Sequence, residues 1–190
     1  MRKRFPVSGA STLLLLLFAV LPAAGQQPPA LAADLLRDLE EVEEKLVGLA
    51  RAIPADKWSW RPAEGVRSVH EVLMHVTADN YLIPAMAGTA APAETGIKGD
   101  SYQTALEFEK RSLTRDQTLS ALEQSFAHIK NALRGTTEAA LNETVTLGPN
   151  QEPKRYLWLL ATTHVHEHLG QLIAYARSNG VVPPWSASGQ

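Results

Sequence analysis

The sequence predicts an all-α protein in which four amphipathic helices pack side by side as a bundle. Apolar residues recur at three- and four-residue steps along four long segments, the spacing of a helix with one apolar face. Capping residues, prolines or glycines stand at the ends of these segments. No alternating strand pattern of useful length lies between them. Because each helix has a single apolar stripe, all four stripes are buried only when the helices pack together.

The first two expected helices lie on either side of a proline-containing loop. The first covers residues 33–53 and ends before Pro54. Its apolar stripe consists of Leu35, Leu36, Leu39, Val42, Leu46 and Leu49. The second begins at Ser68, because Ser68 and Glu71 have the Ser-x-x-Glu spacing of a capping box, and it continues to about Met86.

The chain between the second and third long helices has a different composition. Residues 88–100 are rich in glycine, proline and small residues, which predicts an exposed connection, and a short helix is expected within residues 101–111. The mixed charges of residues 105–117 predict a solvated face. The third long helix ends near Gly135. Its stripe consists of Leu119, Leu122, Phe126, Ile129 and Leu133.

The fourth expected helix, from about Pro153 to Gly180, carries three of the six histidines. At about 100° per residue, His164 and His168 lie about 40° apart on one face, whereas His166 lies about 160° from each of them. His164 and His168 interrupt the apolar stripe, and His166 is expected to face water. A pair of imidazoles one turn apart in a core predicts a metal-binding edge.

The second helix supplies a third candidate ligand. His75 and Asp79 replace apolar residues in its inward stripe. Together with His164 and His168, His75 would provide three nitrogen ligands and leave a coordination position open, as catalytic metal sites do. Asp79 has several readings: it orients an imidazole, completes the coordination sphere, acts as a catalytic base, or is an ordinary exposed or salt-bridged acid.

Other motifs restrict the function further. The chain has no cysteine, so a metal must be held by imidazole and carboxylate. No Gly-rich phosphate loop and no Gly-x-Ser-x-Gly motif occurs in the sequence, which argues against a nucleotide-driven enzyme and against a serine hydrolase. The sequence HEVLM lacks the second histidine of the zinc-protease motif. The remaining histidines, His70 and His128, are expected at the surface.

The N-terminus predicts a secretory signal peptide over residues 1–25. A basic start, MRKRF, precedes an apolar run of about a dozen residues, and small residues at Ala23 and Gly25 predict cleavage after Gly25. A retained membrane anchor is the alternative, but the apolar run is shorter than the roughly 18–20 residues that span a bilayer. We therefore expect an exported protein, periplasmic or secreted, with no membrane span after cleavage and a single domain over residues 29–185.

The charge of the mature chain argues against nucleic acid as a partner. Of 18 basic and 20 acidic residues, cleavage removes three basic ones and no acidic one, which leaves a formal charge of −5. A net negative charge disfavours binding to phosphate backbones. A small-molecule substrate is the partner that the candidate metal site predicts.

Two tracts of the sequence together resemble a known family. The tract WRPAEGVRSVHEVLMHV (60–76) and, about 90 residues later, HVHEHLGQLIAYARSNG (164–180) resemble the DinB-like superfamily of bacterial four-helix metalloproteins. The resemblance covers roughly residues 29–185. It implies a four-helix bundle in which a long connection between the second and third helices crosses the bundle.

The same resemblance implies a site and a chemistry. Matched position by position, the family's metal triad becomes His75, His164 and His168, with zinc or nickel as the expected ion. The family's glycine and glutamine become Gly170, which would allow close helix approach, and Gln171, which would hydrogen-bond near the site. Characterised relatives include thiol transferases and thiol-dependent isomerases, and relatives often form homodimers.

Three functional hypotheses follow from these residues. The first is an exported metal-dependent thiol transferase or hydrolase with a pocket bordered by Asp79, Asn80 and Tyr81. The second is a non-catalytic metal-binding or stress-protection protein whose metal supports folding. The third is a helical interaction module whose core histidines are hydrogen-bonded without a metal.

Overall fold

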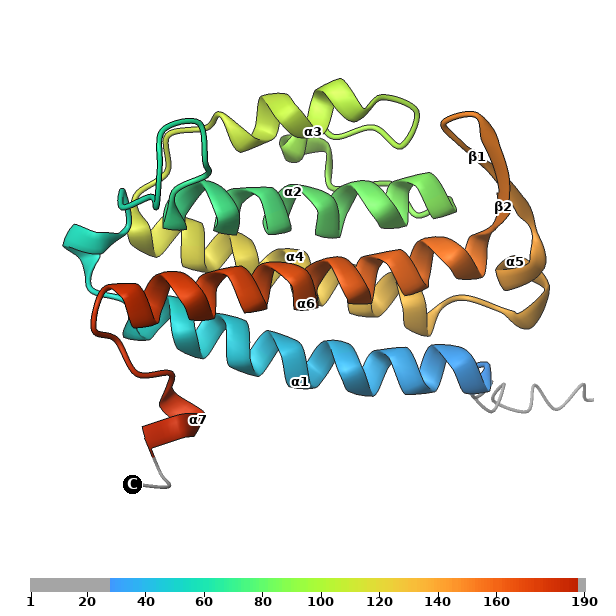
Figure 1. The fold of residues 1–190 in the computed structure, drawn as a ribbon. Coiled ribbons are helices and arrows are strands. Elements are labelled where there is room, and N and C mark those ends of the chain that lie inside the picture. The colour runs from blue at the N-terminus through green and yellow to red at the C-terminus, as the bar shows by residue number, and fades with distance from the viewer. Residues whose placement is uncertain (1–27, 188–190) are drawn as a thin grey trace, which may run out of the picture.

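The computed structural model of the protein describes residues 28–187. The expected signal peptide, residues 1–25, lies outside the described residues. Four long helices form the body of the structure (Figure 1). They are α1 (Ala30–Ala52), α2 (Val69–Ala87), α4 (Arg115–Arg134) and α6 (Lys154–Ser178). The four-helix bundle that the apolar stripes predict is therefore present.

The order of packing in the bundle differs from the order along the chain. Both α1 and α2 pack against α4 and against α6, so α1 lies diagonally opposite α2. The helices α2 and α4 run in the same direction, as do α1 and α6 (Figure 1). A parallel pair of consecutive long helices requires the chain to return along the bundle between them. The structure thus contains the long crossover that the family resemblance implies.

Capping interactions begin two of the long helices. At the start of α2, Ser68 accepts a hydrogen bond from the backbone of Glu71, whose carboxylate in turn accepts one from the backbone N–H of Ser68. Thr114 and Gln117 make the same reciprocal arrangement at the start of α4. Each arrangement satisfies two backbone N–H groups at a helix end, which have no partner within the helix.

The crossover covers the outer face of α2. It comprises the 3-10 turn η2 (Ala93–Thr95) and the helix α3 (Tyr102–Glu109), which lies along α2 (Figure 1). Apolar residues from both sides form a second small core, consisting of Met74, Ala78, Tyr81, Leu82, Ile97, Ala105 and Phe108. Helix α2 is consequently buried on nearly all of its faces, as expected for a helix with neighbours on every side.

A close backbone contact fixes the crossover against the end of α2. A Cβ atom on Gly99 would lie 2.4 Å from the backbone carbonyl of Ala85, so only glycine fits at this position. The expected exposed connection is therefore partly wrong. Thr95 and Ile97 within it are buried, because the connection packs on α2 instead of extending into solvent.

The chain between α4 and α6 contains a feature that the sequence did not predict. After the short helix α5 (Glu138–Asn142), strands β1 (Thr144–Leu147) and β2 (Asn150–Pro153) pair antiparallel as a hairpin. Gly148 supplies the positive φ of 57° in its turn. Each strand has only four residues, too few for an alternating pattern to stand out, so the all-α expectation misses this element.

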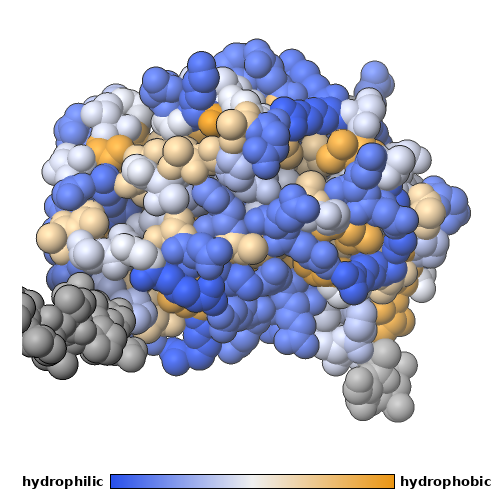
Figure 2. All heavy atoms as spheres, turned by 180° about the vertical axis from the view of Figure 1, so that it is seen from behind, coloured by the Kyte–Doolittle hydropathy of each residue, from blue (hydrophilic) through white to orange (hydrophobic). Residues whose placement is uncertain are grey.

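Two short elements follow the first and last long helices, and the face seen in Figure 2 is mostly polar. The 3-10 turn η1 (Ala55–Lys57) follows α1, and the short helix α7 (Pro184–Ala187) follows α6. Among residues 28–187, none of the helices has the length and apolar character needed to cross a bilayer. The face turned away from the viewer in Figure 1 is largely hydrophilic, with apolar atoms in small separate groups (Figure 2).

Candidate metal centre

Three histidines from two helices converge inside the bundle. His75 lies near the middle of α2, and His164 and His168 lie one turn apart on α6. Nε2 of His164 is 3.1 Å from Nε2 of His75 and 3.0 Å from Nε2 of His168. Only 6% of His75 and 8% of His168 is exposed, and His164 is half-buried. The structure therefore brings together the three residues that the sequence predicts as metal ligands.

Hydrogen bonds on the far side of two of the rings determine which nitrogen is free. Nδ1 of His75 lies 2.8 Å from Oε1 of Glu109, and Nδ1 of His168 lies 2.8 Å from Oε1 of Gln171. A carboxylate and an amide oxygen only accept hydrogen bonds, so both Nδ1 atoms carry the proton. In the neutral rings, the Nε2 lone pairs then point at the centre of the cluster.

The cluster has the donor set and the dimensions that suit a divalent metal. The Nε2 lone pairs of His75 and His168 both face Nε2 of His164, an arrangement that a cation among the three nitrogens would stabilise. In a tetrahedral zinc site with nitrogens at about 2.0–2.1 Å, ligand nitrogens lie roughly 3.3 Å apart. The observed separations of 3.0 and 3.1 Å are close to this spacing. The three histidines can therefore hold a metal ion.

The electrostatic environment keeps the α6 imidazoles in the neutral form that binds metals. Burial, together with the neighbouring His168 and His75, lowers the pKa of His164 to about 3. Burial also lowers the pKa of His168 below its ordinary value, although the hydrogen bond to Gln171 opposes this. Both shifts favour the neutral ring over the imidazolium, and the neutral ring is the form that binds a metal.

Asp79 lies one turn from His75 and faces the same cluster. Its Oδ2 is 3.3 Å from Nε2 of His164 and 3.8 Å from Nε2 of His75. The residue is 9% exposed, and its Oδ1 has no hydrogen-bond partner among the described residues. Burial raises the pKa of Asp79 to about 6, although the charge of His75 opposes this. A buried carboxylate without a full set of partners is a group that a bound cation would stabilise.

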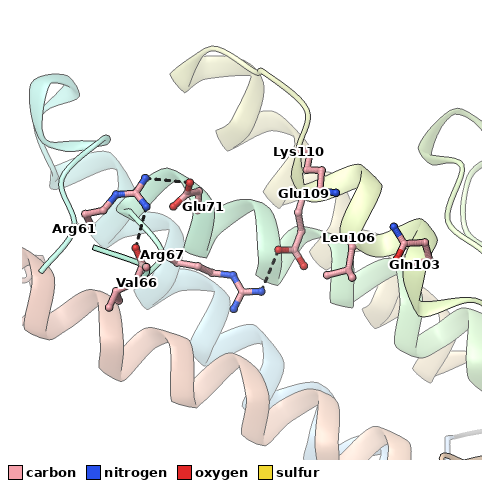
Figure 3. A pocket seen from close by; sticks show the side chains of 9 residues that line it. Arg61, Val66, Arg67, Glu71, Gln103, Leu106, Glu109 and Lys110 are labelled. Atoms are coloured by element: carbon pink, nitrogen blue, oxygen red, sulfur yellow. Dashed lines mark hydrogen bonds and ion pairs between the residues drawn. The ribbon is translucent and has the colours of Figure 1, made fainter. Parts of the chain in front are cut away.

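Glu109 is the site residue that sequence reasoning missed. Its Oε1 accepts from His75, and its Oε2 accepts from Arg67 at 3.2 Å (Figure 3). Burial raises the pKa of Glu109, but the hydrogen bonds and charges of His75 and Arg67 outweigh it and hold this pKa below its usual value. The expected solvated face of residues 105–117 is wrong at this position. No local pattern marks Glu109, because its partner is 34 residues away in the chain.

Gln171 begins a second chain of hydrogen bonds behind the cluster. It accepts from His168 and donates through Nε2 to the Tyr175 hydroxyl at 2.8 Å. That hydroxyl donates to the backbone oxygen of Arg67 at 3.1 Å. Arg67 therefore takes part in both hydrogen-bond chains. Its side chain donates to Glu109 behind His75, and its backbone oxygen accepts from Tyr175 behind His168.

Several other expectations for this region need correction. A Cβ atom on Gly170 would meet nothing within 4 Å, so this exposed glycine mediates no close helix approach. Asn80 is buried and donates to Ser125 on α4, and the Tyr81 ring packs on Phe108, so neither borders a pocket at the cluster. The expectation for His166, in contrast, is confirmed, because this residue is exposed beside Asp38.

The two histidines expected at the surface are in fact half-buried. The Nε2 atoms of His70 and His128 are both enclosed and have no hydrogen-bond partner among the described residues. The ring of His128 packs on that of Tyr81 at a centroid distance of 5.3 Å. Burial lowers the pKa of each histidine below its ordinary value.

A pocket of about 430 Å³ opens beside the cluster. Asp79 and His164 lie in its wall, and the crossover and the β1–β2 hairpin supply its far sides. Its lining residues are Asp79, Leu82, Ile83, Met86, Gly99, Asp100, Ser101, Tyr102, Thr146, Leu147, Gly148, Leu160 and His164. A second pocket of similar volume lies at the other end of α2, where Glu109 and Arg67 line it (Figure 3).

The fold and the site define a class of protein: a four-helix bundle with a parallel crossover and an internal histidine cluster able to hold a metal ion. The family model of the DinB superfamily matches residues 38–172. The chain belongs to the DinB superfamily. No curated protein matches the chain.

Solved structures of similar fold include three that bear on this assignment. A DinB-like protein from Bacillus cereus has a TM-score of 0.66 at 15% identity, over 80% of this chain and 95% of the other. A DinB-like protein from Bacillus subtilis has a TM-score of 0.61 at 19% identity, over 78% and 93%. A mycothiol-dependent maleylpyruvate isomerase has a TM-score of 0.58 at 15% identity, over 74% of this chain and 60% of that one. At these identities the likeness concerns the fold.

Proposed function

We propose that this protein binds a divalent metal through His75, His164 and His168 and catalyses a metal-dependent thiol transfer or hydrolysis. The observation that carries the proposal is the convergence of three Nε2 atoms, two of them on rings that Glu109 and Gln171 orient. Three protein nitrogens leave a coordination position for a small molecule, as in catalytic sites. Zinc and nickel are the ions we expect, since both accept imidazole ligands.

A metal in this site would lower the pKa of a thiol or a water molecule in the open position and so supply a nucleophile at neutral pH. Asp79 is placed to accept the released proton, because its Oδ2 is 3.3 Å from Nε2 of His164 and the residue lines the pocket beside the cluster. Glu109 and Gln171 hold the rings of His75 and His168 in one tautomer and orientation.

The likeness to an isomerase that depends on mycothiol supports the thiol branch of the proposal. Export, which the N-terminal sequence predicts, weighs against it, since low-molecular-weight thiols are chiefly cytoplasmic. We therefore keep hydrolysis as the other branch, and we propose a periplasmic or secreted location. A homodimer stays a prediction from the family resemblance.

A non-catalytic metal-binding or stress-protection role is the second candidate. The depth of the cluster favours it, because a metal joining two buried residues of α2 and α6 would also join these helices. In that case metal removal would lower the stability of the fold, and no thiol or ester substrate would be processed.

The experiment that tests the proposal is metal analysis by mass spectrometry. The mature protein is purified without chelator or affinity-metal resin, beside His75→Ala and His168→Ala, with exposed His166→Ala as the matched control. We expect about one ion per chain in wild type and His166→Ala, and loss in the other two variants. Absence of metal from folded wild-type protein would instead support the interaction module with hydrogen-bonded core histidines.

With a metal established, turnover separates the two candidates. The loaded protein is incubated with thiol and electrophile pairs and with ester substrates, beside His75→Ala. Turnover that depends on His75 supports the enzyme. A metal whose removal lowers only the free energy of unfolding supports the structural role.

A further inference from the structure

The pocket beside His164 has an uneven distribution of charge. Its walls are apolar, with Leu82, Ile83 and Met86 from α2, Leu147 from the hairpin and Leu160 from α6. The charged residues that line it are two acids, Asp79 at the histidine cluster and Asp100 on the exposed rim. Within the described residues, its lining contains no lysine or arginine.

The basic groups near the site face the other pocket and have acidic partners. Arg67 pairs with Glu109, and Arg61 pairs with Glu71 while donating to the backbone oxygen of Val66 (Figure 3). These side chains line the pocket at the start of α2, whereas the pocket beside His164 lies toward the end of that helix. An anionic group bound beside Leu160 would therefore find no lining cation to pair with.

The physical cost of an anion in this pocket is twofold. A carboxylate loses hydration when it moves against leucine and methionine side chains. The lining offers the hydroxyl groups of Ser101, Tyr102 and Thr146 but no positive charge to replace that hydration. The carboxylate is also repelled by Asp100 at the rim, whose charge no lining cation offsets. A neutral group meets neither penalty, and an ammonium group at the rim is attracted to Asp100.

We propose that the pocket beside His164 selects substrates whose body is apolar and carries no anionic group, such as alkyl or aryl thiols or esters that are neutral or cationic. This inference rests on the proposed function, because it assumes that the reacting atom of the substrate lies at the histidine cluster. Asp79 and His164 in the pocket wall then face the reacting end, and Leu160, Met86 and Leu147 contact the apolar body. The volume of about 430 Å³ suits a small molecule.

Three thiols with the same metal-binding head test the proposal. Mercaptohexanol, aminohexanethiol and mercaptohexanoate have equal chains and differ only in the charge at the far end. They are titrated into the metal-loaded protein with isotope-labelled methionine methyl groups. Met86 lines the pocket, and fully buried Met74 is the internal reference.

The expected order of affinity follows from the lining charges. Mercaptohexanol should bind at least about tenfold more tightly than mercaptohexanoate, with aminohexanethiol as tight as mercaptohexanol or tighter. The Met86 signal should shift and the Met74 signal should stay. Equal or tighter binding of mercaptohexanoate would overturn the proposal.

Neighbouring leucines on α6 provide matched variants. Leu160 lines the pocket, whereas Leu159 is 41% exposed and lies outside its lining. Leu160→Lys should reduce or reverse the preference for mercaptohexanol over mercaptohexanoate, and Leu159→Lys, with the same change of net charge, should keep it. The same behaviour in both variants would contradict the proposal. If Leu160→Lys does not fold, Asp100→Lys on the rim makes the same test, with exposed Asp116→Lys as its control.

The design separates failure of the inference from failure of the proposed function. Metal content is measured on the protein used in each titration. A protein without metal would contradict the proposed function. The order of the three affinities, measured from the Met86 signal, still decides the charge preference of the pocket. A metal-loaded protein that prefers mercaptohexanoate would contradict only the inference about the charge preference of the pocket.

Discussion

Nδ1 of His75 on α2 donates a hydrogen bond to Oε1 of Glu109 on α3, over 2.8 Å. The other carboxylate oxygen of Glu109 is held by Arg67, which precedes α2. A helix of the crossover thus orients a histidine of the bundle core. The crossover is therefore part of the candidate metal centre as well as a connection between α2 and α4.

Replacement of Glu109 should weaken metal binding. In Glu109→Ala, His75 loses the acceptor that fixes its tautomer and ring orientation, so metal affinity should fall by about 10- to 100-fold. Competition with a chromophoric chelator measures the affinity. Glu107→Ala, on the exposed face of the same helix, should bind metal like wild type. Equal affinities in the two variants would exclude an orienting role for Glu109.

Asp79→Asn should have opposite effects on the metal-free and the loaded protein. The folded-state pKa of Asp79, about 6, lies above the ordinary 3.8 because burial disfavours the charge. The protonated carboxyl is favoured in the fold, so its contribution to stability is present below the ordinary pKa and is lost as pH rises through about 6. Metal-free Asp79→Asn should therefore be more stable than wild type at neutral pH, with less change between about pH 4 and 7.

Urea unfolding of chelator-treated protein across this range measures the first effect. In the loaded protein the carboxylate no longer lacks a partner, so the amide should lower metal affinity. A metal-free variant that is less stable than wild type at every pH would show that the buried charge of Asp79 does not destabilise the metal-free fold.

Two glycines should respond oppositely to alanine. Gly99→Ala places a Cβ atom 2.4 Å from the Ala85 backbone, so the crossover must shift, at a cost of about 1–3 kcal/mol in the free energy of unfolding. Gly170→Ala, within α6 and with open space around it, should instead stabilise the protein by about 0.5–1 kcal/mol. Denaturant midpoints with unchanged slopes would measure both. Stabilisation by Gly99→Ala would contradict the close contact between the crossover and α2.

Half-buried His128 should make stability depend on pH. Burial lowers its folded-state pKa below 6.5, so its contribution to stability is present above 6.5 and is lost as pH falls through the folded-state pKa. The free energy of unfolding of wild type should therefore fall more steeply below about pH 6.5 than that of His128→Gln. Exposed His166→Gln controls for the loss of a histidine. A His128→Gln variant with the wild-type pH slope would exclude this contribution.

Much of the fold could be predicted because its signals are local. The capping box of Ser68 and Glu71 begins α2 where expected, and the stripe from Leu35 to Leu49 is buried in α1 as predicted. The hairpin around Gly148 was missed because its strands are short and its pairing involves few residues. The connection at residues 88–100 was read as exposed because small residues indicate a turn equally well on a surface and against a helix.

The candidate site divides in the same way. Helical spacing alone places His164 and His168 on one face and turns His166 away from them, and the interrupted stripe of α2 selects His75 and Asp79. Glu109 escaped because a single acid in a mixed-charge segment resembles its solvated neighbours. Gly170 was misjudged, because composition does not reveal whether a glycine faces a neighbouring helix or open space.

By itself the sequence determined the helices, their buried faces and the three imidazoles that point inward, because these depend on a period of 3.6 residues that the chain carries along its length. Only the tertiary structure decided which helices are neighbours, that Glu109 supports His75, and that the crossover and the hairpin border the pocket beside His164. Contacts between residues far apart in the chain depend on how whole elements pack. No local pattern encodes the direction in which the crossover returns.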